Sequence, residues 1–134
     1  MGDFNEIQCD SEKIGGAKKP WHSVSEFWEA MEESGLHGMG FLGPKFTWNN
    51  YRWGDATIME RLDRGMCNRG WRDWFPNFFI RHLDFWGSDH RPLVLDFSND
   101  LDSKNNGLPN SKRRFFFEEC WMDDGECQDI VASN

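Results

Sequence analysis

The sequence has no long apolar run, no recognisable signal peptide and no clustered cysteines. Its apolar runs fall far short of the roughly 18 residues that a membrane-spanning helix needs. Met1 is not followed by the basic and apolar segments of a secretory leader. The four cysteines form neither a C-x-x-C pair nor a Cys/His group with zinc-ligand spacing. These absences argue against a membrane span or a zinc site, and we expect an intracellular protein, nuclear or cytoplasmic, with free thiols.

Positive charge is also scarce. The chain has 15 Lys and Arg against 23 Asp and Glu, which leaves a net charge of −8 at pH 7. A protein that binds nucleic acid mainly by electrostatics carries a basic surface, so the composition disfavours this class. An enzyme that cleaves phosphodiesters is still compatible with the charge. A site built from carboxylates is acidic when empty, and a bound divalent cation inverts its local field.

Aromatic residues, in contrast, are abundant at 16% of the 134 residues, with eight Trp and twelve Phe. Each can remove a large area from water, which favours a globular domain over a disordered chain. Residues 98–114 are rich in Ser, Asn, Asp, Lys, Gly and Pro and are predicted to be a linker. Residues 115–134 are predicted to be an amphipathic tail. We therefore expect one domain over residues 1–97.

Local patterns predict a short series of helices and strands. Ser23 and Glu26 fit a capping box that would start a helix, and Gly35 fits its end. Asn68 is placed to cap a second, shorter helix. Strands are expected at residues 46–48, 58–67, 78–83 and 93–95, with a hairpin between the first two.

Four segments contain side chains suited to catalysis: Gly2-Asp3-Phe4-Asn5, Phe46-Thr47-Trp48-Asn49, Glu60-Arg61-Leu62-Asp63-Arg64 and Ser88-Asp89-His90-Arg91-Pro92. Taken singly, each has an ordinary explanation. An Asp near an Asn at a strand end is usually turn chemistry, and an Asp flanked by Arg is usually a solvated ion pair. A Trp is usually core, and a lone Asp-His pair is more often a surface loop than a site.

Together and in this order, the segments resemble the endonuclease/exonuclease/phosphatase superfamily, in particular the endonuclease domain of plant LINE-type (non-LTR) retrotransposons. The matching strings are GDFNEI at residues 2–7, E-K-x-G-G at 12–16, G-x-x-FTWxN at 43–50, ERLDR at 60–64, N-x-x-W-x-x-x-FP at 68–76 and SDHxPL at 88–93. The resemblance covers residues 2–97. It implies an α/β fold, namely part of a four-layer DNase I-like α/β sandwich of mainly antiparallel strands with flanking helices.

The resemblance also implies catalytic roles. Asp3 would hold or deprotonate the attacking water, and Asn5 would donate a hydrogen bond to the scissile phosphate. Asp89 would be a ligand of Mg²⁺ or Mn²⁺, which prefer hard oxygen donors. His90 would contact the phosphate and stabilise its growing charge. Asp63 would hold His90 by a hydrogen bond that fixes the imidazole tautomer and raises its pKa.

Other parts of the resemblance concern substrate and partners. Trp48 and Asn49 lie on the strand that faces substrate in the family, so a DNA contact is implied, with plain packing an equal alternative for Trp48. Ser88 would support the loop that carries the Asp-His pair. In the parent element DNA is the partner and a reverse transcriptase domain lies downstream. The tail at 115–121 looks like the segment that leads toward it.

The first half of the family's domain, which supplies an Asn and a Glu near the metal, has no counterpart in this sequence. We therefore expect the chain to be inactive alone, and to be unstable as a monomer because half a sandwich leaves strand edges and apolar faces uncovered. Three alternatives stay open: a non-enzymatic remnant or binding module, a phosphatase of the same fold, and an acidic interaction protein. The last predicts that Asp3, Asn5, Asp63, Asp89 and His90 are scattered in space.

Overall fold

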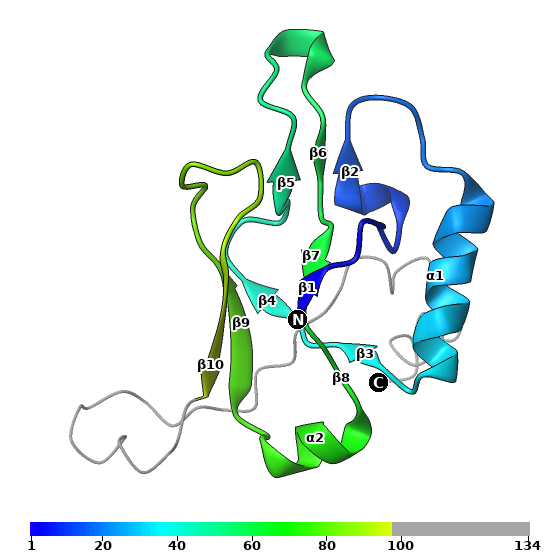
Figure 1. Ribbon diagram of the computed structural model, residues 1–134, viewed down its shortest axis with the longest axis vertical. Coiled ribbons are helices and arrows are strands. Elements are labelled where there is room, and N and C mark those ends of the chain that lie inside the picture. Colours follow the sequence, from blue (N-terminus) through cyan, green and yellow to red (C-terminus); the bar gives the residue numbers. More distant parts are fainter. Residues whose placement is uncertain (98–134) are drawn as a thin grey trace, which may run out of the picture.

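The structure is a computed structural model that describes residues 1–97. The predicted linker and tail, residues 98–134, lie outside the described residues. The described part contains two α-helices, α1 (Trp21–Glu33) and α2 (Arg69–Trp74), together with short strands and two 3₁₀ turns at Asp10–Glu12 and Gly54–Ala56. In Figure 1, α1 lies along one side of the strands and α2 lies at the lower end. Neither helix has the length and apolar character needed to cross a membrane.

The strands form four small sheets with mainly antiparallel pairing. Two antiparallel pairs join β1 (Gly2–Asp3) to β7 (Asp63–Arg64), and β3 (His37–Gly38) to β8 (Met66–Cys67). One three-stranded sheet has the order β10 (Leu93–Phe97), β9 (Phe78–His82) and β4 (Phe41–Leu42), with β4 parallel to β9. The other has the order β2 (Lys13–Ile14), β6 (Met59–Glu60) and β5 (Trp48–Asn49). The protein is therefore a mixed α/β protein with mostly antiparallel strands, as expected.

The predicted capping box at the start of α1 is wrong. The helix begins at Trp21 and its N-cap residue makes no side-chain hydrogen bond to the first turn. The Ser23 hydroxyl donates instead to the buried carboxylate of Glu6, so a tertiary contact takes the group that a local cap would have used. The predicted end is confirmed, because the helix stops just before Gly35, which adopts a left-handed φ of 60°.

Two of the other predicted elements differ from the structure: the strand expected at 46–48 is shifted to β5 at Trp48–Asn49, and the strand expected at 58–67 is interrupted. Asn68 caps α2, since its side-chain oxygen accepts a hydrogen bond of 2.8 Å from the backbone N–H of Trp71. The hairpin between β5 and β6 is confirmed by their antiparallel pairing. The prediction of one long strand at 58–67 is wrong, because this segment is divided into β6, β7 and β8, which pair with different neighbours. At the break, the backbone N–H groups of Leu62 and Asp63 donate to the Thr47 side chain instead of to a strand.

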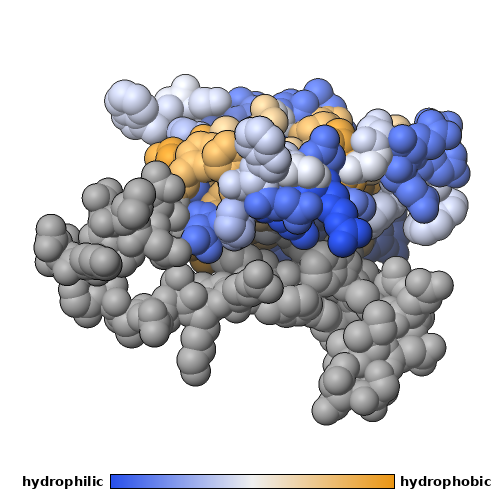
Figure 2. All heavy atoms as spheres, turned by 90° about the horizontal axis from the view of Figure 1, so that it is seen from below, coloured by the Kyte–Doolittle hydropathy of each residue, from blue (hydrophilic) through white to orange (hydrophobic). Residues whose placement is uncertain are grey.

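The apolar core of the described residues is small and divided. One buried cluster consists of Ile7, Val24 and Leu62, with Trp48 packed against it. A second is formed by Met39, Cys67 and Ile80, with a ring of partly buried residues around it: Phe41, Trp71, Phe78, Leu93 and Leu95. Many large apolar side chains stay exposed, and orange patches of apolar atoms are visible on the side of the molecule drawn in Figure 2.

Buried charges supplement this core. Arg64 is 1% exposed and Glu12 is 2% exposed, and their side chains form an ion pair of 2.9 Å. A second buried arginine, Arg61, contacts the same carboxylate at 2.8 Å. Arg64 also donates to the backbone carbonyls of Glu6 and Arg61. The Arg-flanked run at residues 60–64 is therefore an internal charge network and not the solvated ion pair that is the usual meaning of such a run.

Candidate functional site

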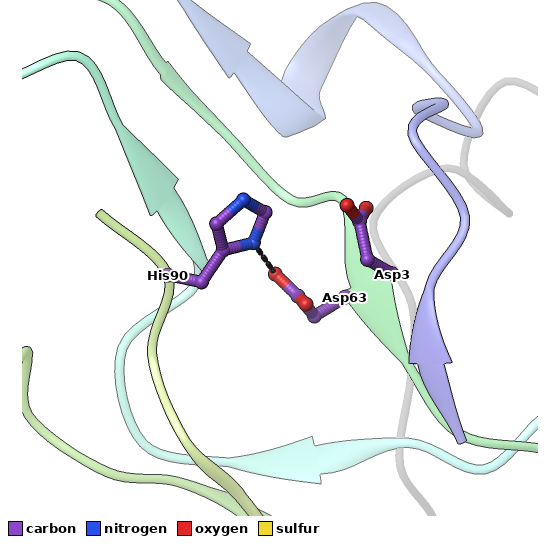
Figure 3. A group of neighbouring side chains, drawn as sticks. All are labelled: Asp3, Asp63 and His90. Atoms are coloured by element: carbon purple, nitrogen blue, oxygen red, sulfur yellow. Dashed lines mark hydrogen bonds and ion pairs between the residues drawn. The ribbon is translucent and has the colours of Figure 1, made fainter. Parts of the chain in front are cut away.

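Three of the predicted catalytic residues lie together, although they come from the beginning, middle and end of the described chain. Asp3 is in β1 and Asp63 is its direct partner in β7. His90 is in the loop before β10 and faces them (Figure 3). One nitrogen or oxygen atom from each side chain lies within 4.8 Å of the others. These three residues are therefore gathered, which is the opposite of what the acidic interaction protein predicts.

His90 and Asp63 form a directional pair. The imidazole Nδ1 donates to Asp63 Oδ2 at 2.8 Å, so its second nitrogen, Nε2, is turned away from the pair, as Figure 3 shows. Burial lowers the pKa of His90, but the hydrogen bond and charge of Asp63, with smaller contributions from Asp3 and Asp89, outweigh burial and raise the pKa overall. The imidazole therefore carries positive charge over a wider pH range than a free histidine does.

Asp63 is held in position by a residue that the sequence reasoning did not single out. Thr47 is fully buried, and its Oγ1 accepts hydrogen bonds from the backbone N–H groups of Leu62 at 3.0 Å and Asp63 at 2.9 Å. The Thr47 carbonyl also accepts from the backbone N–H of Arg91, one residue after His90, at 2.7 Å. Thr47, the residue just before β5, thereby connects the segments that carry both halves of the Asp–His pair. The sequence feature that could have indicated this role is the polar Thr47 inside the apolar Phe-Thr-Trp run.

The loop carrying His90 is braced by hydrogen bonds from within the loop and from the β5–β6 hairpin. The Ser88 hydroxyl accepts a hydrogen bond of 3.1 Å from the backbone N–H of His90. The Ser88 carbonyl accepts from the Tyr51 hydroxyl at 2.6 Å, a contact that the sequence did not suggest. An isolated antiparallel bridge pairs Trp48 with His90, and the Asn49 N–H donates to the Asp89 carbonyl at 3.1 Å. The β5–β6 hairpin therefore fixes the loop.

Asp3 and Asn5 lie at a sharp turn that leaves β1. The Asp3 carboxylate is exposed and its Oδ1 accepts from the backbone N–H of Asn5 at 2.8 Å. Asn5 has a φ of 56°, a left-handed conformation that asparagine tolerates better than most residues. Its side chain is exposed beside the cluster. The turn keeps the carboxylate of Asp3 accessible to water and leaves its second oxygen available for a ligand.

Asp89, the predicted metal ligand, points elsewhere. Its Oδ2 accepts a hydrogen bond of 2.9 Å from the indole N–H of Trp48, and among the described residues it is not part of the group formed by Asp3, Asp63 and His90. Trp48, Asn49 and Asp89 instead line one side of an open hollow of about 420 Å³ next to the hairpin, with Asn50, Tyr51, Arg52 and Ile58.

The donor set fits a divalent cation only in part. Asp3 and Asp63 supply the hard oxygen atoms that Mg²⁺ and Mn²⁺ prefer, and Mg²⁺ often binds proteins through one or two carboxylates while keeping several waters. One Asp63 oxygen is already used by His90, and a protonated imidazole cannot be a ligand. The described residues would thus hold a cation through Asp3 and the remaining oxygen of Asp63, and would hold it weakly.

Comparison with known proteins yields no relative against which these roles can be checked. No protein-family model, no curated protein and no solved structure matches the chain. The motif resemblance and the geometry of the site are therefore the basis of the roles inferred for Asp3, Asn5, Asp63, Asp89 and His90.

Proposed function

We propose that this chain carries the aspartate–histidine part of a metal-dependent phosphodiesterase site that acts on DNA. The observation that carries the proposal is the meeting of Asp3, Asp63 and His90 from three distant segments. Ion pairs on a surface need no such convergence, whereas a reaction at one phosphorus atom does. The proposed fold of the whole catalytic domain is the four-layer DNase I-like sandwich, of which these strands and helices would be the later part.

His90 would stabilise negative charge on the phosphate. Its Nδ1 is occupied by Asp63, so Nε2 is the nitrogen that can donate to a phosphate oxygen. The raised pKa makes the charged imidazolium more populated than in a free histidine at the same pH. A donor that is fixed before the substrate arrives stabilises developing charge without reorganisation. Asp63 would act as a positioning residue that sets the tautomer and charge of the ring.

Asp3 would orient the attacking water, because an exposed carboxylate can accept a proton from the water and so direct the lone pair of the water oxygen at phosphorus. A divalent cation, when bound, would neutralise charge on the phosphate and lower the pKa of bound water. Asn5 would donate its amide N–H to the phosphate from the adjacent turn. Asp89, in contrast with the first expectation, would act mainly by holding Trp48.

The DNA assignment is supported by the surface next to the site. Trp48, Asn49 and Tyr51 line a hollow together with Asp89, the residue before His90, and amide and aromatic side chains are the groups that contact bases and sugars. A small soluble phosphomonoester would not need this extended surface, so the phosphatase alternative is less well supported. The same motif resemblance leads us to propose a reverse transcriptase domain as the downstream neighbour in the parent protein.

We further propose that the described residues alone do not sustain turnover, because two carboxylate groups, one of them shared with His90, are a weak anchor for the cation. A plasmid-nicking assay with Mg²⁺ or Mn²⁺ tests this, and we expect no nicking above background. Nicking that disappears in His90→Ala would overturn the inactivity and confirm the phosphodiesterase. Turnover of a phosphomonoester but not of DNA would favour the phosphatase alternative.

The site itself can be tested without turnover. We expect Mn²⁺ to broaden the NMR signals around Asp3 and His90 selectively, and Asp3→Asn to abolish the broadening. The matched control is Asp55→Asn, which removes an exposed carboxylate from the β5–β6 hairpin, outside the cluster. A short DNA duplex should shift the ring signals of His90. Equal Mn²⁺ broadening around Asp55, or no DNA response at His90, would support the non-enzymatic remnant instead.

A further inference from the structure

An aromatic cluster lies away from the proposed active site, where α2 meets the end of β10. The rings of Trp71 and Phe75 are 5.0 Å apart, and Phe97 lies 6.0 Å from the first and 5.4 Å from the second. Trp74 is in the last turn of α2 beside them. We name these four residues, Trp71, Trp74, Phe75 and Phe97, the α2 aromatic face. It is continuous with the core, because Trp71 also packs on Phe78 at 4.8 Å.

Much of this face is open to water. Trp74 is 82% exposed, Phe97 is 53% exposed and Phe75 is 40% exposed. Single exposed apolar residues are normal on a soluble protein, but a contiguous apolar group attached to the core usually marks an interaction surface. In Figure 2, which views the molecule from the α2 side, apolar and strongly hydrophilic surfaces lie next to each other.

We propose that the α2 aromatic face is the docking surface for the chain's own segment 115–122. This segment reads Phe-Phe-Phe-Glu-Glu-Cys-Trp-Met and is the most aromatic stretch after residue 97. Aromatic side chains pair edge-on or offset with other aromatic rings, at about 0.5–1.5 kcal/mol beyond the area they bury. The inference is independent of the phosphodiesterase proposal.

Chain connectivity favours this occupant over an outside partner. Phe97 belongs to the face and is also the last described residue, so the chain leaves the domain from the docking surface itself. The connecting residues 98–114 can span at most roughly 60 Å when extended, which is ample for a return to the face. Covalent attachment through a short connection gives a local concentration on the order of millimolar, far above that of a partner in dilute solution.

Charge complementarity points to the same occupant. The segment 115–122 contains two glutamates, Glu118 and Glu119, and no Lys or Arg. The exposed surface of α2 carries Arg69 and Arg72, against the single acid Asp73. The whole chain is acidic, at −8, so a basic helix face is where an acidic segment is least repelled. Such complementarity sets orientation and specificity more than affinity.

A spin label on Cys120, inside the segment, tests the proposal in the full chain. Cys9→Ser and Cys127→Ser remove two of the other three thiols, and the third, Cys67, is protected by burial. We expect loss of the indole N–H signals of Trp71 and Trp74, while the signal of Trp53, at the far hairpin tip, persists. Replacing Phe115, Phe116 and Phe117 by Ser should restore the lost signals. Leu108→Ser is the matched control for a polar change in the connection.

Two results would overturn the proposal. Equal or absent broadening at Trp74 and Trp53 would mean that the segment has no preferred site. Broadening in a mixture of spin-labelled protein and isotope-labelled, spin-free protein would mean that a second copy covers the face. Trp74→Ser gives a check that does not depend on folding, because this side chain is 82% exposed and contributes little to the core. We expect it to restore the Trp71 signal.

Discussion

Replacing Glu12 by glutamine is expected to destabilise the fold severely and to disturb the Asp63–His90 pair. Glu12 is 2% exposed and accepts from Arg64 at 2.9 Å and from Arg61 at 2.8 Å. Burial raises the pKa of this carboxyl group, but the two guanidinium groups outweigh burial and hold the pKa below its ordinary value of 4.5. The network joins the segment after β1 to the strand that carries Asp63.

The magnitude follows from what the substitution leaves behind. A glutamine side chain at this position would keep the shape of the glutamate and remove its charge, so the buried guanidinium groups of Arg64 and Arg61 would lose the carboxylate that they share. Breaking a buried ion pair in this way costs about 3–5 kcal/mol, a large part of the roughly 5–15 kcal/mol by which a domain is stable. Because the pKa of Glu12 is lowered in the folded state, its carboxylate stabilises the fold above pH 4.5, and this stability is lost as the pH falls through the folded-state pKa.

Urea unfolding followed by tryptophan fluorescence measures this effect at pH 7. Glu29→Gln, on the exposed face of α1, is the matched control because it removes the same charge from the surface. A double variant that adds Arg64→Met should lose less unfolding free energy than the two single variants lose together, since the buried positive charge of Arg64 is then removed. If the unfolding free energy of Glu12→Gln lies within about 0.5 kcal/mol of that of Glu29→Gln, the buried charge network does not stabilise the fold.

Three further outcomes are expected. Asp63→Asn should lower the pKa of His90, because Asp63 makes the largest of the contributions that raise this pKa against the effect of burial; a ring titration by NMR measures the pKa, and an unchanged value would contradict the pairing. Since the His90 pKa is raised, the stability contributed by this pair is present below pH 6.5 and is lost as the pH rises through the folded-state value. Burial lowers the pKa of His82 to about 4, so neutral His82 contributes stability above pH 6.5 that is lost as the pH falls toward 4. His82→Gln should therefore flatten the curve of unfolding free energy against pH between these values. An unchanged slope would contradict the buried, neutral state of His82. Thr47→Val should cost about 1–3 kcal/mol in urea unfolding by leaving two buried N–H groups without an acceptor, whereas Thr47→Ser should cost less.

Features with local causes were predictable from sequence. Asn68 caps α2 because its side chain reaches a backbone N–H three residues on, and Gly35 ends α1 because it adopts a left-handed φ freely. The hairpin of β5 and β6 and the strands β9 and β10 follow from alternation and turn residues. The order of short motifs also indicated Asp3, Asp63 and His90, whose side-chain polar atoms the fold brings within 4.8 Å of one another.

Features that depend on residues distant in the sequence could not be predicted from local sequence patterns. Ser23 fits a cap by spacing, but Glu6 lies close enough in the fold to bind its hydroxyl. The run at 58–67 looks like one strand, but Thr47 interrupts its ladder by accepting two of its N–H groups. Asp89 fits a metal ligand by motif, but Trp48 lies beside it and donates to it.

The sequence by itself determined which side chains are available for phosphodiester chemistry, and where short helices and turns begin and end. Only the tertiary structure decided which polar groups meet: Asp63 with His90, Glu12 with two buried arginines, and Asp89 with Trp48. The physical reason is range. Caps and turns are settled by hydrogen bonds a few residues apart, whereas a buried charge needs a partner that the chain supplies only after it has folded.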